Sequence, residues 1–391
     1  MVPLPDSDAH GAEGGRRVVD PVLLWDRISR LVPQLSKVAA QRVRPATQVN
    51  YVKVLEDLCV SLQRAGRHPV QKHLQLPLWS AKTWDPVLLD YLEQRFDEGR
   101  PRDVINKVPF ALLWADPTVG PSVRQSLPLS HALLVGWERL EPPRSRPPLP
   151  KPVAFAAAAD MVQDEVEKGK KGLAFMGPAV LTMFVAYLRP SECLSLRNFQ
   201  LVRKDPRRKD RRNFFTFVLA PEEIGEPTKT NLVDVNVPID LPEHEWIADI
   251  WDMVAERGAL RPTEHVFKFQ YRHLLEQFRA TMDSIGCDEL QATPHCLRHG
   301  GASEDYAARA RSLNQIQKRG QWKSAASVQR YSKPGRIGLQ LQKLDTEALQ
   351  LVECLSHNAE RFFRGYFDKL YDEDDLATAE SFSRSSRAAA P

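Results

Sequence analysis

The spacing of apolar residues changes along the chain and predicts two regions of different character. Through residues 20–139, apolar side chains recur every three or four positions, which is the period of an amphipathic helix. Between about 213 and 239 the pattern alternates or becomes β-branched, as it does in strands. After residue 243 the helical period returns. The pattern therefore predicts a mainly helical protein with a small β-sheet in its second half.

Start and stop signals delimit the helices of the first region. Thr47 is placed to cap one helix and Gly66 to end it. Asp85, followed by Pro86 at the first helical position, is placed to cap another helix, and Gly99 to end it. These signals predict a small all-helical N-terminal domain. Its further helices are expected near 20–36, 101–115 and 129–139.

The second region combines helices with a hairpin-like segment. Two strands are expected at 213–220 and 231–239, joined by a turn-rich piece and preceded by a basic hairpin tip at 202–212. Because short consecutive strands pair antiparallel, we expect a small antiparallel sheet inserted among helices. The helices of this region are expected at 154–169, at 175–188 and from 243 to 370.

Proline and basic residues crowd the segment 140–152, LEPPRSRPPLPKP, which favours extended polyproline geometry and a semi-rigid linker. The two ends of the chain are small, polar and without periodicity. The resulting domain prediction is a disordered N-terminus at 1–19, a helical domain at 20–139, a linker at 140–152, a second domain with C-terminal helices at 153–371, and a disordered tail at 372–391.

Composition narrows the class of protein but not its chemistry. The net charge of +4 is small, and the five cysteines are scattered without C-x-x-C pairing, which argues against a disulfide framework and a zinc site. The longest apolar run, 177–188, is too short to span a bilayer, and the N-terminus has no apolar signal core. We expect an intracellular protein, located in the nucleus if its source is eukaryotic and in the cytoplasm otherwise.

Six residues of the second region stand out together. Each alone has an ordinary structural explanation: an arginine pairs with a nearby acid such as Glu192, a turn lysine is solvated, and a Trp or Tyr fills a core. Their order along the chain is what calls for a common explanation. The six are Arg189 at the end of an apolar helix, Lys229 in the turn between the strands, His295 and Arg298 three apart on a helix, and Trp322 and Tyr331 nine apart in RGQWKSAASVQRYSK.

In this order the six residues resemble the tyrosine recombinase, or phage integrase, family. That family carries Arg in an R-x-x-E helix start, Lys on a β-turn, H-x-x-R, then His or Trp, then Tyr. The resemblance covers roughly 150 to 335, and the extension of H-x-x-R by His299 is also typical. Two departures are Trp322 in place of the more frequent His and the polar Gln321 before it. The helical N-terminal domain resembles the family's core-binding domain in size, class and position.

The resemblance implies a metal-independent DNA strand transferase without cofactor. Tyr331 would attack a phosphodiester and form a 3′-phosphotyrosyl intermediate, with His295 as its base. Arg189 and Arg298 would hold the non-bridging oxygens, because guanidinium forks match that geometry and stay charged at all relevant pH values. Lys229 would protonate the leaving 5′-oxygen. The sixth residue, Trp322, would donate its indole N–H to a phosphate oxygen.

The same resemblance implies double-stranded DNA as the partner, clamped between the two domains, and a homotetramer on two duplexes. The C-terminal segment 337–371 would then dock on a neighbouring subunit, whereas an ordinary amphipathic helix would pack on its own domain. Basic residues of the linker, the hairpin tip and the Trp322 segment are expected to contact phosphates. They are Arg144, Arg146, Lys151, Arg207, Arg208, Lys209, Arg211, Arg212 and Lys323.

Two alternatives remain at this point. An inactivated, mobile-element-derived protein would bind DNA without cutting it. A type IB topoisomerase uses similar residues, but it normally carries Lys or Arg where this chain has His295. The sequence therefore favours a site-specific recombinase or integrase.

Overall fold

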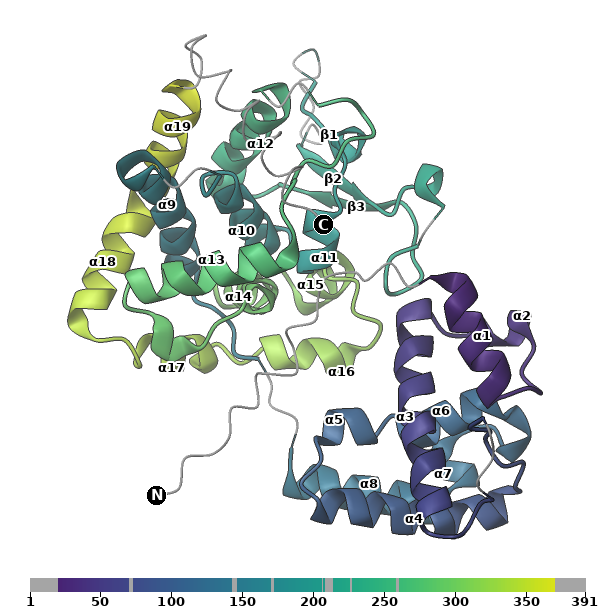
Figure 1. Ribbon diagram of the computed structural model, residues 1–391. Coiled ribbons are helices and arrows are strands. Elements are labelled where there is room, and N and C mark those ends of the chain that lie inside the picture. Colours follow the sequence, from purple (N-terminus) through teal and green to yellow (C-terminus); the bar gives the residue numbers. More distant parts are fainter. Residues whose placement is uncertain are drawn as a thin grey trace. The chain divides into compact units, whose positions relative to one another are not determined.

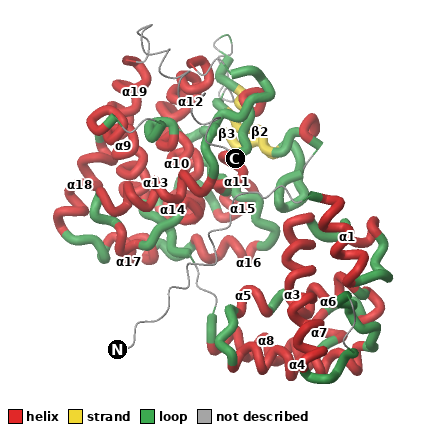
Figure 2. Tube along the Cα trace, viewed as in Figure 1, coloured by secondary structure: helices red, strands yellow, loops and turns green. Residues whose placement is uncertain are grey.

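The computed structural model describes residues 20–69, 73–142, 146–169, 172–205, 207, 214–225, 227–257 and 260–369 (Figure 1). The chain divides between residues 145 and 146 into two compact units. Figure 2 shows helices and loops throughout the smaller unit, and strands in the larger one. The predicted fold class, mainly α with a small antiparallel sheet, is confirmed. None of the helices in the described ranges combines the length and hydropathy needed to cross a membrane.

The smaller unit is a helical bundle around a core that includes Leu55, Trp84 and Leu112, each fully buried. Gly66 and Gly99 end α3 and α4 in the left-handed conformation, with φ of 67° and 65°, as the sequence predicts. The helices of this unit are α1 (Pro21–Leu31), α2 (Lys37–Ala40), α3 (Pro45–Arg64), α4 (Ala81–Asp97), α5 (Arg102–Ile105), α6 (Val108–Ala115), α7 (Val123–Ser126) and α8 (Pro128–Leu140).

Both N-terminal caps predicted for this unit are wrong. Helix α3 begins at Pro45, so Thr47 lies inside its first turn. Helix α4 begins at Ala81, so Asp85 lies inside it. The Asp85 carboxylate is buried and accepts hydrogen bonds from the backbone N–H of Leu129 at 2.9 Å and of Ser130 at 3.0 Å. Asp85 therefore caps the start of α8, because folding brings the two helices together.

The larger unit is a helical body that carries the sheet. Its elements are α9 (Lys151–Lys168), α10 (Met176–Val185), α11 (Pro190–Leu194), β1 (Leu201–Val202), β2 (Thr216–Leu219), β3 (Val235–Pro238), α12 (Glu245–Arg257), α13 (Tyr271–Ser284), α14 (Pro294–Ala307), α15 (Leu313–Arg319), α16 (Ala325–Val328), the 3₁₀ turn η7 (Gln329–Tyr331), α17 (Gly335–Leu341), α18 (Thr346–His357) and α19 (Ala359–Lys369).

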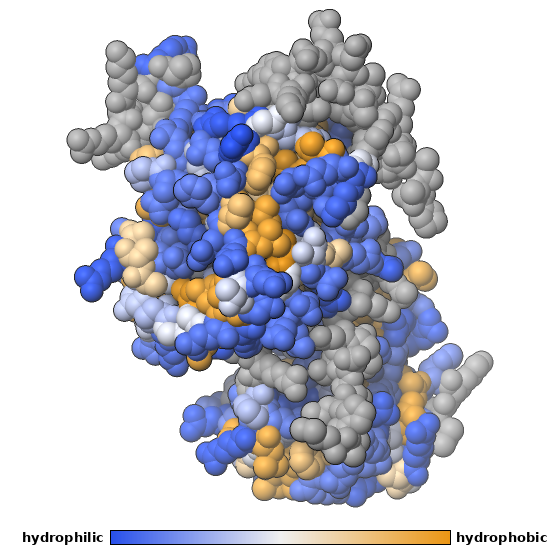
Figure 3. All heavy atoms as spheres, turned by 90° about the vertical axis from the view of Figure 1, so that its left-hand side faces the viewer, coloured by the Kyte–Doolittle hydropathy of each residue, from blue (hydrophilic) through white to orange (hydrophobic). Residues whose placement is uncertain are grey.

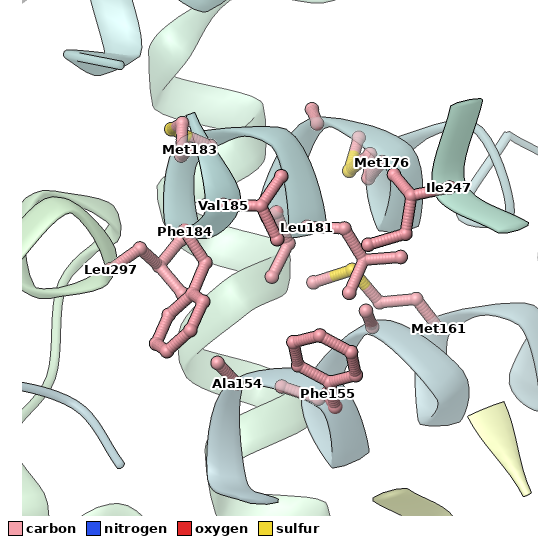
Figure 4. Close-up of a cluster of buried hydrophobic side chains, with 14 of the residues drawn as sticks. Ala154, Phe155, Met161, Met176, Leu181, Met183, Phe184, Val185, Ile247 and Leu297 are labelled. Atoms are coloured by element: carbon pink, nitrogen blue, oxygen red, sulfur yellow. The ribbon is translucent and has the colours of Figure 1, made fainter. Parts of the chain in front are cut away.

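Helix α9 forms the centre of this core. Its alanines at 156–159 are fully buried, and these small side chains let α10 and α18 approach closely. Figure 4 shows Phe155 and Met161 of α9 lying near Leu181 of α10 and Ile247 of α12. Because α9 is covered on several sides, it packs as an apolar helix rather than as a half-exposed one.

The three strands pair antiparallel in the order β1-β2-β3. Phe217 of β2 lies opposite Val237 of β3, and its ring packs 5.1 Å from that of Trp251 on α12. The two expected strands are confirmed, although both are shorter than the sequence pattern. The additional strand β1 takes up the first residue of the predicted hairpin tip. Residue 206 and residues 208–212 of that tip lie outside the described residues.

The end of the linker belongs to the larger unit. Leu149 is buried, and its backbone N–H donates to the carbonyl oxygen of Cys296 at 3.3 Å. Lys151, expected in the linker, is the first residue of α9. The proline-rich segment therefore becomes helical two residues before its expected end, because Pro152 is compatible with the first turn of a helix.

The C-terminal helices pack against their own unit. Helix α18 contacts α9, and α19 contacts both α9 and α12. Phe363 and Phe367 of α19 are fully buried in the core. On the face drawn in Figure 3 most side chains are hydrophilic, with apolar patches between them. In the single chain these helices complete the core of their own unit.

His244 introduces a pH dependence into this unit. Its imidazole is 4% exposed, beside the ring of Phe155. Burial lowers its pKa to about 3, and the charges of Lys151, Arg319 and Arg311 act in the same direction, opposed by Asp240. The imidazole is therefore neutral in the folded chain, whereas in the unfolded chain it takes up a proton near its ordinary pKa of 6.5.

Replacing His244 by leucine should make the free energy of unfolding less sensitive to acid. The unfolded chain binds more protons than the folded chain between about pH 6.5 and 3. His244 therefore makes its full contribution to the free energy of unfolding above this pH window. As the pH falls through the window this contribution decreases, by about 2 kcal/mol between pH 7 and 5. Urea unfolding at both pH values measures this loss, with exposed His273→Leu as the control. Equal losses in parent and His244→Leu would contradict the prediction.

Candidate active site

Tyr331 lies in the 3₁₀ turn η7 and is 2% exposed. Its hydroxyl is 2.8 Å from Nδ1 of His299, and the two rings stack with centroids 5.6 Å apart. Burial raises the pKa of Tyr331 to about 12, although Arg298, Arg330 and Arg189 act against this rise. In the free protein the phenol is therefore protonated, held in place, and surrounded by positive charge.

His299 is a site residue that the sequence analysis did not select. Burial lowers its pKa to about 3, and the charges of Arg298 and Arg330 add to this effect, so its imidazole is neutral. The available signal was its spacing from His295, because residues four apart lie on the same face of helix α14. The structure pairs Tyr331 with His299, the second of these two histidines.

Arg298 lies at the centre of the cluster and is 4% exposed. Its two terminal nitrogens donate to the backbone carbonyl oxygens of Tyr187 and Gly320. The guanidinium carbon lies 4.6 Å from the centroid of the Trp322 ring, which in turn lies 4.7 Å from that of Tyr331. Arginine, tryptophan and tyrosine therefore pack in one contiguous group, in which the tryptophan and tyrosine rings are tilted by 45° to each other.

Glu192 joins the two arginines. Its carboxylate accepts from the Arg189 side chain and, at 2.8 Å, from the Arg189 backbone N–H at the start of α11. One of its oxygens also lies 3.5 Å from a terminal nitrogen of Arg298. The structural partner suggested by the R-x-x-E spacing is confirmed, and this same acid orients both guanidinium groups.

His295 is half-buried one turn before His299. Burial lowers its pKa to about 4, and the charges of Arg146, Arg298, Lys229 and Arg189 lower it further. The positive charges of these four residues therefore all disfavour protonation of His295. Its ring lies 6.2 Å from that of Tyr271, which is half-buried.

Lys229 is exposed at the tip of the turn between β2 and β3. The backbone of this turn is closed by a 2.8 Å bond from Thr228 N–H to Leu232 and a 2.9 Å bond from Asn231 N–H to Thr228. On the side of the turn nearest Trp322, the Thr230 hydroxyl donates to Gln321 at 3.2 Å. The sequence prediction that Lys229 occupies a β-turn is confirmed.

The loop that carries Trp322 depends on its two preceding residues. A Cβ atom on Gly320 would lie 1.8 Å from the Trp322 ring, so glycine is required there. Gln321 adopts φ of +53°, which non-glycine residues rarely do. The Trp322 backbone N–H donates to the backbone carbonyl of Gln317 at 3.1 Å, and the Gln317 side-chain amide donates back to the Trp322 backbone carbonyl at 3.0 Å. The turn therefore aims the indole at Arg298.

The expected phosphate-contacting residues differ in their surroundings. Arg146 and Lys323 are exposed, whereas Lys151 pairs with Glu243 at 3.5 Å. Arg207 is exposed and pairs with Asp205 at 2.9 Å. Within the described part of the chain, no three His, Cys, Asp or Glu side chains form a group suited to a metal ion. The remaining basic candidates, Arg144, Arg208, Lys209, Arg211 and Arg212, lie outside the described residues.

The sequence matches no model of a known protein family and no curated protein. Among solved structures, the chain is similar to the Tn1549 transposon integrase in complex with transposon right-end DNA, at 13% identity over 82% of this chain and 99% of that chain, with a TM-score of 0.47. It is also similar to the XerH site-specific recombinase bound to its difH substrate in a pre-cleavage complex, at 15% identity over 77% of this chain and 81% of that chain, with a TM-score of 0.44.

Proposed function

We propose that this chain is a site-specific DNA recombinase or integrase that cleaves and rejoins duplex DNA through a 3′-phosphotyrosyl intermediate on Tyr331. The observation that carries the proposal is the buried cluster around this residue. Its hydroxyl meets a neutral histidine, and its ring lies against Trp322, which also supports the Arg298 guanidinium. A nucleophile, a proton acceptor and a phosphate-binding cation thus lie within one contiguous group.

The two arginines supply the binding energy for the phosphodiester. Arg298 and Arg189 share the Glu192 carboxylate, which fixes their guanidinium groups relative to each other. Attack on phosphorus places additional negative charge on the non-bridging oxygens, and fixed guanidinium donors stabilise that charge without reorganising. A phosphate bound here would also offset the positive charge that lowers the pKa values of His295 and His299. Substrate binding would thereby make both imidazoles stronger bases.

Three residues carry the protons of the proposed step: Tyr331, His299 and Lys229. The phenolic oxygen of Tyr331 attacks phosphorus while its proton passes to Nδ1 of His299, its hydrogen-bond partner. The bond from phosphorus to the 5′-oxygen breaks, and Lys229 gives that oxygen a proton. In this proposal Trp322 donates its indole N–H to a non-bridging oxygen, and His295 does the same. Because the phosphotyrosyl bond retains the energy of the phosphodiester, rejoining needs no nucleotide.

The proposed partner is double-stranded DNA, gripped by both units. Exposed Arg146 and Lys323 are proposed to contact the backbone, together with the basic hairpin tip. Strand exchange between two duplexes needs one tyrosine for each of four strands, so the proposed active form is a tetramer. Exchange of C-terminal helices between subunits remains a proposal of its own.

Covalent capture on nicked DNA tests the proposed function. A pool of randomised duplexes, each with a nick close to the position to be cut, should trap the intermediate because the short cleaved fragment diffuses away. We expect an adduct stable in SDS, and peptide mapping should place the attached nucleotide on Tyr331. Sequencing of the captured DNA then identifies the preferred site.

Three outcomes would decide against the proposal. DNA binding without an adduct on any duplex would indicate the inactive, DNA-binding alternative. An adduct mapped to another residue would exclude Tyr331 as the nucleophile. Plasmid relaxation without site preference would favour the type IB topoisomerase alternative.

A further inference from the structure

Gln321 occupies a position that its backbone conformation does not favour. Its φ of +53° is one that glycine adopts freely, whereas a non-glycine residue held there is strained. The side chain is nevertheless 5% exposed. Its neighbours on both sides belong to the candidate site, since the Gly320 carbonyl accepts from Arg298 and Trp322 follows directly.

The buried amide of Gln321 forms a hydrogen bond with the turn between β2 and β3. Its Oε1 accepts from the hydroxyl of Thr230 at 3.2 Å, across 91 positions of sequence. The Thr230 hydroxyl lies 3.0 Å from that of Thr228, which accepts from the Leu232 N–H at 3.2 Å. These hydroxyl contacts run along the turn between β2 and β3 and end at the loop that carries Trp322.

Lys229 lies between the two threonines that form this chain of contacts. Its own side chain is exposed, so the position of its ammonium group depends on where the turn is held. Burial is the main reason that the pKa of His295 is lowered, and the charge of Lys229 contributes in the same direction. A short turn linked through one buried amide can therefore control how often Lys229 reaches a bound phosphate.

We propose that Gln321 is a positioning residue that anchors the Lys229 turn beside Trp322 through Thr230. This inference rests on the proposed function, because its consequence is delivery of a proton by Lys229 to the leaving 5′-oxygen. Gln321 touches neither the DNA nor the reacting atoms in this role. It acts by raising the fraction of time in which Lys229 is in place.

A change of leaving group separates positioning of Lys229 from general damage to the site. A duplex with sulfur in place of the bridging 5′-oxygen at the captured cleavage position releases a thiolate. Thiols have pKa values of about 8.5, so a thiolate departs without needing a proton. General acid catalysis typically contributes about 100- to 10,000-fold with an oxygen leaving group. Loss of Lys229 function should therefore slow cleavage of the oxygen substrate selectively.

Gln321→Gly is the informative variant, because glycine keeps the left-handed backbone and removes only the amide. We expect cleavage of the oxygen substrate to fall about tenfold or more, while cleavage of the sulfur substrate stays within about twofold. Thr230→Val should give the same selective loss, and the double variant should lose little more than either single one. Lys229→Ala removes the proposed proton donor itself, so it should show the largest selective loss on the oxygen substrate.

Gln317→Ala is the matched control. Its amide supports the same loop by donating to the Trp322 carbonyl at 3.0 Å, whereas the hydrogen bond to the Lys229 turn comes from Gln321. It should change both substrates by the same factor. Equal losses on both substrates in Gln321→Gly, or no loss on either, would overturn the inference.

Failure of the proposed function gives a different pattern. If the parent protein forms no adduct with either substrate, the recombinase proposal falls and the inference with it. If the parent forms adducts but sulfur does not rescue Lys229→Ala, Lys229 is not the proton donor. Gln321 then has no proton donor to position, and the inference is overturned while the nucleophile remains.

Discussion

Tyr331→Phe should abolish covalent capture of nicked DNA while the protein still folds and binds DNA. Phenylalanine keeps the ring that packs 4.7 Å from Trp322 and stacks on His299, so the cluster retains its shape. The change removes only the hydroxyl and its 2.8 Å contact with Nδ1 of His299. Losing one such hydrogen bond costs about 1 kcal/mol, which is small beside the complete loss of a nucleophile.

Tyr306→Phe provides a control matched in chemistry and location. Tyr306 is half-buried on α14 and packs against the same small cluster as Tyr331. It should keep full adduct formation, measured by SDS gel electrophoresis on the captured duplex, and both variants should retain gel-shift binding. Adduct formation by Tyr331→Phe at the parent's rate would assign the nucleophile elsewhere.

Local sequence patterns predict most helices and strands of the fold, but they do not predict which of these elements pack against one another. Gly66 and Gly99 end helices because a left-handed residue is a local requirement, and the sequence predicts both. Asp85 was also identified as a cap, but the helix it caps is α8, more than forty residues away. An aspartate side chain has the same preference for helix N-termini whichever helix is near, and packing decides which one that is.

For the candidate site as well, the sequence predicts some of the residues that come together but not all of their contacts. The order of Arg189, Lys229, Arg298 and Trp322 along the chain suggested a common site, and the structure brings Arg298 and Trp322 into contact and links Arg189 to Arg298 through Glu192. The histidine next to Tyr331 could not be chosen from spacing alone. His295 and His299 lie one turn apart on α14, and only the position of η7 determines which imidazole meets the phenol.

Gln321 shows why a departure from a motif is difficult to interpret from one sequence. As a residue beside Trp322, it looked like a polar replacement that weakened the resemblance. The structure gives it a partner on the sheet, Thr230, which no local pattern connects with it. A polar residue at a strained, buried position is informative only once its hydrogen-bond partner is known.

Phe363→Ala should cost the larger unit about 3–5 kcal/mol of unfolding free energy, the usual range for truncating a buried aromatic residue. The Phe363 ring is fully buried, 5.7 Å from the ring of Trp246 and 6.3 Å from that of Phe367. A Cβ on Gly177 would lie 2.6 Å from this ring, so α10 closely approaches it and cannot easily fill the cavity.

Urea unfolding of the full chain measures this loss, with Leu351→Ala as the control. Leu351 lies on the adjacent helix α18 and is 42% exposed, so its truncation should cost less than about 1 kcal/mol. A similar small loss in Phe363→Ala would contradict the burial of α19 in its own unit. Deleting everything after residue 340 would be a poor substitute, since it also removes buried Val352, Leu355 and Phe367.

The same variant discriminates between two roles of α19 in assembly. If α19 stays on its own unit, Phe363→Ala destabilises the free protein, and DNA-bound assembly weakens only as far as folding does. If α19 docks on a neighbouring subunit instead, the free protein should lose little stability, while assembly on DNA in native electrophoresis should weaken at concentrations where the protein is folded. Because two aromatic rings of α19 already fill the core between α9 and α12, exchange requires an equivalent apolar site on the neighbour. If each subunit gives up its own α19 and receives the α19 of a neighbour, the vacated core of each subunit provides that apolar site, and no additional apolar surface is needed.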